Sequence, residues 1–119
     1  MEITSVINRY SDFISEKFSA LPIEIGQVED SGEQVIRIYP NNYNFAYEQD
    51  SYGLIFELAL PNVALTDAMQ TADTISKVIE LDSLDDIRLS NYEVEFYFGE
   101  QIAGTVILFL INLFIQRCR

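Results

Sequence analysis

The sequence predicts a single α+β domain in which two helices pack on a mostly antiparallel sheet of about five strands. Apolar residues recur at three- and four-residue steps in two segments and alternate in others. The expected elements follow the order helix, three strands, helix, two strands, which is typical of helices packed on one sheet. The chain has 119 residues and shows no internal repeat or linker, so residues 1–119 are expected to form one domain.

The first helix is expected over residues 2–19, where the apolar positions fall on one side. Those positions are Ile3, Val6, Ile7, Tyr10, Phe13, Ile14 and Phe18. Pro22 ends this segment because a proline cannot continue a helix. Two short strands are expected over residues 23–28 and 34–39, and residues 30–32 between them (Asp-Ser-Gly) are typical of a turn.

A third strand and a second helix are expected in the middle of the chain. The strand covers residues 53–60, and its apolar face consists of Leu54, Phe56, Leu58 and Leu60. Thr66 is predicted to cap a helix over residues 66–81, because its hydroxyl oxygen can accept a hydrogen bond from an early backbone amide. The apolar stripe of this helix is predicted to be Met69, Ala72, Ile75, Val78 and Ile79.

Two further strands are expected to close the chain. The alternation over residues 87–98 changes phase partway, which predicts a bulge near Ser90 and Asn91. The segment 102–115 is apolar on both sides but too short for a membrane-spanning helix, which needs about 20 apolar residues. It is therefore expected to be a central strand with both faces covered. One cover is a helix of the same chain, and the other is a second helix or a neighbouring subunit.

Charge and composition restrict the function. The formal net charge is -12, from 19 acids and 7 bases, so the surface repels DNA and anionic membranes. The charge leaves open basic protein partners, further copies of the chain, imitation of nucleic acid, or a pore through which DNA slides. The chain has no histidine, which excludes histidine-based triads and zinc sites. We therefore expect no enzyme, cofactor or metal. The start of the sequence predicts no signal peptide, and one cysteine, Cys118, suits a reducing compartment.

A stretch rich in aromatic residues, from position 39 to 52, is expected to be a long loop. Its candidate interface residues are Tyr39, Tyr43, Phe45, Tyr47 and Tyr52. Aromatic side chains on a loop are typical of protein interface anchors. The alternatives are rings that fold back on the core and a hairpin extension. Stacking on single-stranded nucleic acid is disfavoured because the basic groove that it needs is missing.

Two groups of carboxylates are candidate sites. Glu93 and Glu95 alternate with apolar residues and predict an acidic face on the fourth strand. This face is read as the solvated side of a half-buried strand or as the lining of a lumen, and a glycosidase-type pair is the other alternative. The second group is Glu80, Asp82, Asp85 and Asp86. It lacks the spacing of an EF-hand, so a solvated helix end is favoured over a calcium site.

Element order and size resemble those of the tail terminators and the neck, or head-completion, proteins of long-tailed bacteriophages. The resemblance covers essentially the whole chain. It rests on the first amphipathic helix, the strands in "IEIGQV" and "QVIRIYP", and "YGLIFELAL" followed by the helix "TDAMQTADTISKVIEL". The closing hairpin "YEVEFYFGEQIAGTVILFLI" completes it.

The resemblance implies a non-catalytic structural protein of the virion, assembled in the host cytoplasm. Six identical subunits would form a ring on the end of the tail tube, contact neck proteins, and let DNA pass through the lumen without binding it. The competing interpretation is a small acidic inhibitor or immunity protein, which blocks a basic nuclease or another nucleic-acid-binding partner by electrostatic complementarity.

Overall fold

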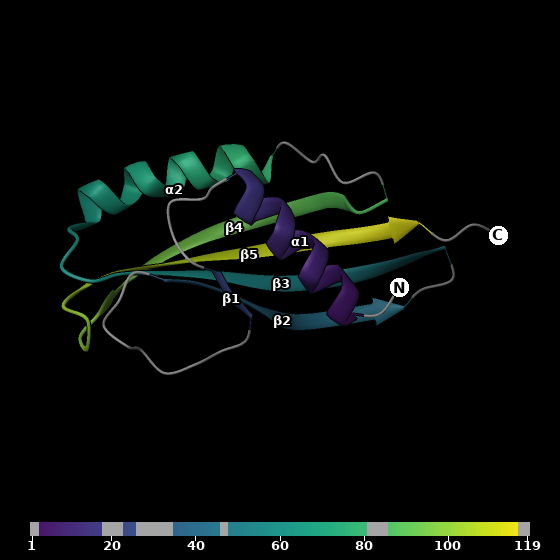
Figure 1. Cartoon of the computed structure of the whole chain (residues 1–119), viewed down its shortest axis with the longest axis horizontal. Coiled ribbons are helices and arrows are strands. Elements are labelled where there is room, and N and C mark those ends of the chain that lie inside the picture. The colour runs from purple at the N-terminus through teal and green to yellow at the C-terminus, as the bar shows by residue number, and fades with distance from the viewer. Residues whose placement is uncertain (1–2, 18–22, 26–34, 46–47, 81–85, 117–119) are drawn as a thin grey trace.

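The computed structural model describes residues 3–17, 23–25, 35–45, 48–80 and 86–116. Its elements are α1 (Ile3–Lys17), β1 (Ile23–Ile25), β2 (Val35–Phe45), β3 (Gln49–Leu60), α2 (Leu65–Ile79), β4 (Arg88–Gly99) and β5 (Gly104–Gln116). Figure 1 shows the two helices against a long, twisted sheet. The expected α+β class, with two helices on a mostly antiparallel sheet, is confirmed.

The sheet has the strand order β1-β2-β3-β5-β4. Four of these strands, β2, β3, β5 and β4, are antiparallel to their neighbours. The antiparallel part thus has four strands rather than five, because β1 is only three residues long and pairs in parallel with β2. As expected, β5 is central, between β3 and β4.

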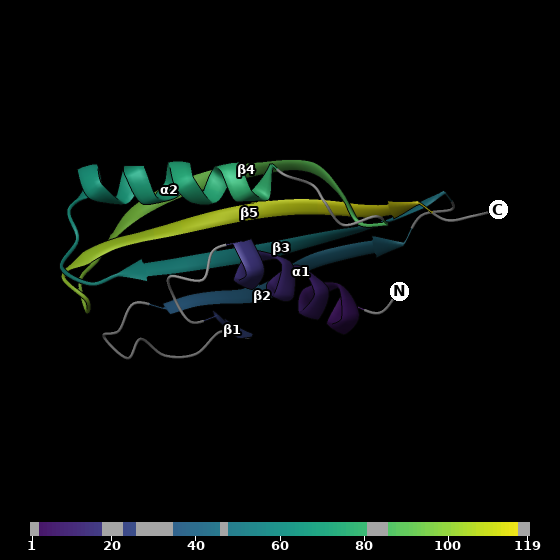
Figure 2. The ribbon, with the colours of Figure 1, turned by 45° about the horizontal axis from the view of Figure 1, so that its top comes forward.

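Both helices lie on the same face of the sheet (Figure 2). Their buried residues join one apolar cluster with alternate residues of β2, β3 and β5. The cluster includes Val6, Tyr10 and Ile14 of α1, Ala68, Ala72, Ile75 and Ile79 of α2, Ile36 and Ile38 of β2, Leu54, Phe56 and Leu58 of β3, and Ile107, Phe109 and Ile111 of β5. The predicted apolar face of the third strand is thereby confirmed. Phe56 and Phe109 meet edge to face at its centre, with ring centroids 5.5 Å apart.

Helix α2 differs from the prediction at its start and on its stripe. The helix begins at Leu65 after Ala64, and no side chain caps it, so the prediction that Thr66 is the cap is wrong. Met69 is 51% exposed rather than part of the apolar stripe. The buried stripe passes through Ala68, one position earlier, because residues four apart lie on the same side of a helix. No helix in the described ranges is long and apolar enough to cross a membrane.

The stretch predicted as a long loop is instead the end of the β2–β3 hairpin, as in the alternative of a hairpin extension. The pairing continues from Tyr39 opposite Ile55 to Phe45 opposite Asp50. A register shift between Pro40 and Asn42 absorbs the residues that suggested a turn.

The end of the sheet near β4 agrees with the sequence. The pairing of β4 with β5 shifts between Leu89 and Asn91, which confirms the predicted bulge. Downstream of it, Val94 faces the helices, whereas Glu93 and Glu95 lie on the opposite face. Alternate residues on the two sides of β4 are therefore placed as the alternation predicted.

Candidate interaction surfaces

Strand β4 forms an open edge of the sheet in the described part of the chain. It is 12 residues long, and an edge strand of this kind presents unpaired backbone amides and carbonyls to other chains. Its second half carries three exposed rings, those of Phe96, Tyr97 and Phe98, and Phe98 is 67% exposed. Aromatic rings beside an unpaired strand edge are typical of a surface that binds protein.

A groove of about 530 Å³ lies beside these rings. Its walls come from the connection between β3 and α2, from the end of β4, and from the turn before β5. The lining residues are Asn62, Val63, Ala64, Leu65, Phe96, Tyr97, Phe98, Ala103 and Thr105. The hydroxyl of Thr105 donates a hydrogen bond to the carbonyl of Val63 at 3.0 Å, which ties β5 to one wall. The lining is mostly apolar, as in sites that receive an apolar side chain.

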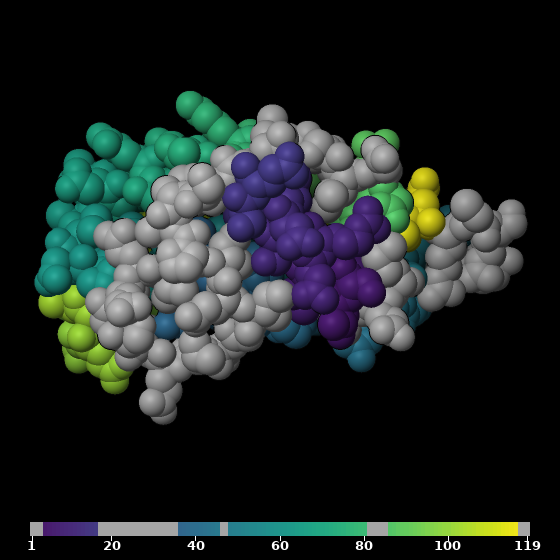
Figure 3. Space-filling model, viewed as in Figure 1, coloured from purple at the N-terminus to yellow at the C-terminus, as the bar shows by residue number. Residues whose placement is uncertain are grey.

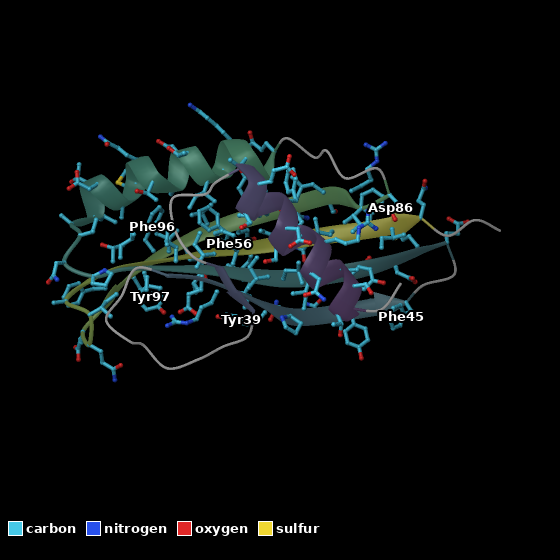
Figure 4. The ribbon with its side chains drawn as sticks, in the orientation of Figure 1. Tyr39, Phe45, Phe56, Asp86, Phe96 and Tyr97 are labelled. Carbon is cyan, nitrogen blue, oxygen red and sulfur yellow. The ribbon has the colours of Figure 1, made fainter. Side chains whose placement is uncertain are left out.

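A second open edge belongs to β2. Strand β1 pairs only with Ile36–Ile38, so β2 from Tyr39 to Phe45 has no neighbour on its outer side within the described ranges. Tyr43 and Phe45 are exposed there, and their ring centroids lie 5.1 Å apart. Figure 4 places Phe45 at one end of the sheet, and Phe96 and Tyr97 toward the other. The molecule is 50 Å long, so the two aromatic edges are well separated.

The face of the sheet opposite α1 and α2 carries a regular pattern of side chains. In one row across the strands, Tyr39, Ile55, Leu110 and Glu93 are neighbours, and in the next row Arg37, Glu57, Leu108 and Glu95 are neighbours. We call these two rows the outer face. Its central residues on β3 and β5 are partly buried, whereas Glu93 and Glu95 at its margin are exposed.

A hydrogen-bonded group of three side chains lies on this outer face. The carboxylate of Glu57 accepts hydrogen bonds from the hydroxyls of Tyr39 and Tyr97, at 3.3 and 3.4 Å. Tyr97 comes from β4 and reaches across β5 to do so. Burial, together with the negative charge and hydrogen bond of Glu57, raises the pKa of Tyr39 to about 12. The two hydrogen bonds hold both tyrosine hydroxyls against one carboxylate.

The structure separates the five predicted aromatic interface residues. Tyr43 and Phe45 are exposed, and Tyr39 is partly buried on the outer face. Tyr52 is 0% exposed, so its prediction as an accessible interface residue is wrong. It shares the helix-facing side of β3 with Leu54 and belongs to the core. Tyr47 lies outside the described residues.

The carboxylates after α2 do not form a metal site in the described residues. Glu80 accepts a hydrogen bond from the hydroxyl of Tyr92 at 2.5 Å. Asp86 accepts two from the guanidinium of Arg9, at 2.6 and 2.9 Å, which holds the pKa of Asp86 below its ordinary value. Glu80 therefore links the end of α2 to β4, and Asp86 links α1 to the residues just before β4. Asp82, Asp85 and Cys118 lie outside the described residues.

Comparison with known proteins gives no family for this chain. No family model matches it, and no curated protein matches it.

Sequence reasoning missed two important residues. Phe98 was read only as part of an alternating strand, although the exposure of its ring depends on β4 being an edge. Glu57 was overlooked because its tyrosine partners are 18 and 40 residues away in sequence. A charged residue in an otherwise apolar strand was the available signal.

Proposed function

We propose that this chain is a non-catalytic assembly protein whose copies join edge to edge into a ring, as in a phage tail terminator or neck component. The observation that carries the proposal is that the described residues leave two different strand edges open on opposite sides of one sheet, that of β4 and that of β2 beyond β1. Each carries exposed aromatic rings. Two unlike surfaces on one subunit favour head-to-tail association, which closes into a ring when the rotation between subunits permits.

The two edges are compatible in direction and in charge. Strands β2 and β4 run in opposite directions, so a neighbour that continues the sheet would place them antiparallel. Residues 39–45 of β2 contain no charged side chain and so do not repel the carboxylates of β4. Pairing of β4 with the β4 of another copy is disfavoured, because a pairing centred on Val94 would set Glu93 opposite Glu95.

The biological setting is supported only by the resemblance in element order. In that setting the ring is part of the virion, assembles in the host cytoplasm, and contacts the tail tube and neck proteins. DNA passes through the lumen, and the net charge of -12 discourages its adhesion. The proposed role needs no catalytic residue, cofactor or metal.

The decisive experiment measures mass by light scattering after size exclusion, at low and moderate salt. We expect a closed multimer near six subunits, with assembly favoured by salt as repulsion between acidic subunits is screened. Phe45→Ser and Phe98→Ser are each expected to reduce the mass to that of a monomer. Met69→Ser is the matched control, because it removes from α2 an apolar side chain about as exposed as that of Phe45.

Mixing the two interface variants tests the head-to-tail arrangement. Each variant retains one intact edge, so an equimolar mixture of the Phe45→Ser and Phe98→Ser proteins is expected to form a dimer through the remaining joint and not a ring. A joint made of two identical surfaces would give no such recovery. A strict monomer or symmetric dimer of the unmodified chain under all conditions would contradict the proposal.

A small acidic inhibitor is the second candidate function. Its specific support is that Glu93 and Glu95 are exposed and form no hydrogen bond or ion pair within the described residues, beside the accessible ring of Tyr97. Carboxylates and tyrosines in this arrangement suit a basic protein surface. A monomeric chain that captures a basic nuclease, and loses it when Glu93 and Glu95 are replaced by glutamine, would favour this function.

A further inference from the structure

The outer face of the sheet is not a joint of the proposed ring, although Tyr97 at its margin also lies beside the edge of β4. The ring would join subunits at the edges of the sheet, whereas the outer face lies across its centre. Its two rows place the partly buried side chains of Ile55, Leu108 and Leu110 side by side. Beyond the rows, Ala59, Val106 and Ile102 form a second small cluster that is already buried, so the accessible apolar strip ends there.

Acidic groups border this apolar strip on one side. Leu110 has Glu93 as its neighbour on β4, and Leu108 has Glu95. Cross-strand neighbours lie about 5 Å apart, so each carboxylate is adjacent to a leucine. Glu93 and Glu95 are two positions apart on one strand, a separation of about 7 Å. On the far side of the strip, Arg37 is almost fully buried next to Glu57, so the accessible charges in these two rows are negative. The exposed Arg88 lies on the same side of the sheet but beyond the rows, opposite Phe114.

We propose that the outer face binds a basic amphipathic helix of a partner protein. The apolar side of such a helix would cover Ile55, Leu108 and Leu110, and its lysine or arginine side chains would pair with Glu93 and Glu95. Basic residues four positions apart on a helix are separated by about 6 Å along its axis, which matches the spacing of the two carboxylates.

Backbone hydrogen bonding favours a helix over an extended segment. A strand lying flat on the face of a sheet would leave its backbone amides and carbonyls without partners, whereas a helix bonds its own. Helices already cover the other face of this same sheet (Figures 1 and 2). The space-filling view shows that covered face, with α1 in purple and α2 in teal over the sheet (Figure 3).

The helix comes from a different protein, because the helices of this chain are not basic. The charged residues are Arg9, Asp12, Glu16 and Lys17 on α1, and Asp67, Asp73 and Lys77 on α2. Neither helix offers a row of cations to the acidic margin. Docking of a second copy through the same face would instead bring Glu93 and Glu95 near like charges.

The Tyr39–Glu57–Tyr97 group positions the rings that flank this surface. Tyr97 is 47% exposed, and its hydroxyl is held by the carboxylate of Glu57 across β5. A ring fixed in this way gives contact area at low entropic cost and can lie against a cationic side chain. Glu57 is thus a positioning residue for the surface.

The test uses a synthetic 18-residue peptide of leucine and lysine that forms an amphipathic helix, labelled for fluorescence anisotropy. A peptide of the same composition, with lysine spread around the helix, controls for net charge. We expect the segregated peptide to bind the full chain about tenfold more tightly at moderate salt, because only it buries leucine on the apolar strip. Equal binding of both peptides would overturn the proposal.

Variants of the protein locate the binding. Glu93→Gln/Glu95→Gln is expected to weaken binding of the segregated peptide about fivefold, since two exposed ion pairs are lost. Glu48→Gln/Asp73→Asn removes two exposed carboxylates elsewhere and is expected to leave the affinity within about twofold. Equal weakening by both pairs would show general charge attraction and refute the site.

Methyl NMR of the peptide complex supplies an independent readout. Shift changes are expected at Ile55, Leu108 and Leu110, and not at Ile75 or Ile79 on the buried side of α2. Changes confined to the groove beside Phe98 would overturn the proposal. Since neither measurement requires a ring, failure of this inference and failure of the proposed function are distinguishable.

Discussion

Neighbouring residues of β5 test whether the sheet is covered on one face only. Ile111 is 1% exposed beneath the helices, whereas Leu110 points to the outer face and is only partly buried. Replacing either with alanine removes three carbon atoms, worth about 2.4 kcal/mol of transfer free energy when fully buried. Ile111→Ala also leaves a cavity in a closed core, so we expect a loss of about 3–4 kcal/mol in unfolding free energy.

Leu110→Ala is expected to cost much less. Water can occupy the space on the open face, and part of the side chain is exposed already, so the loss is about 1 kcal/mol. Urea unfolding followed by circular dichroism measures both variants. With a slope of about 1.5 kcal/mol per molar urea, Ile111→Ala should lower the midpoint by about 2 M. An equal cost for both variants would refute the reasoning, because it would mean that the outer face is as closely packed as the core.

Three further outcomes follow from local contacts. Asp86→Asn removes the bidentate salt bridge between Asp86 and Arg9 of α1. Folding lowers the pKa of the Asp86 carboxyl, so the salt bridge stabilises the protein above about pH 4 and this stabilisation is lost as the pH falls through the folded pKa. The loss should be at most about 0.5 kcal/mol at pH 7 by urea titration, because the pair is exposed. Absorbance titration should show Tyr39 ionising near its pKa of about 12, and at a lower pH in the Glu57→Gln variant. Because folding raises this pKa from about 10, the contribution of Tyr39 to stability declines as the pH rises above about 10. Gly104→Ala should disrupt the β4–β5 hairpin, because the added Cβ would lie 2.0 Å from the backbone carbonyl oxygen of Leu60 in β3. Thermal melting measures the loss of stability.

The sequence was informative where one side of an element is buried. Leu54, Phe56 and Leu58 alternate because the helices cover one face of β3, and that regularity is visible without a structure. The phase change near Asn91 was equally legible, because an extra residue in one strand moves every later side chain to the other face.

The hairpin from Tyr39 to Tyr52 differs from the predicted loop for a physical reason. Proline and asparagine at positions 40–42 are typical of turns, but here they lie at a bulge on a strand with an open outer side. A strand with one open side tolerates a proline at a bulge more readily than a central strand does. The exposure of Phe45 and the burial of Tyr52 then follow from the pairing of β2 with β3, which the local sequence does not encode.

The candidate surfaces depend on strand order even more strongly. The sequence predicted that β5 needs a cover on each face, and both helices cover the same one. The second face is shielded in part by its own chain, through Tyr97 reaching over β5 to Glu57, and the apolar strip beside that bridge stays partly accessible. Strand β5 has two apolar faces, but helices cover the sheet on one side only. The apolar area on the other side is therefore not fully buried, and it is bordered by Glu93 and Glu95, which no cation of α1 or α2 reaches. That combination is what the proposed basic helix would cover, whichever assembly the edges of the sheet build.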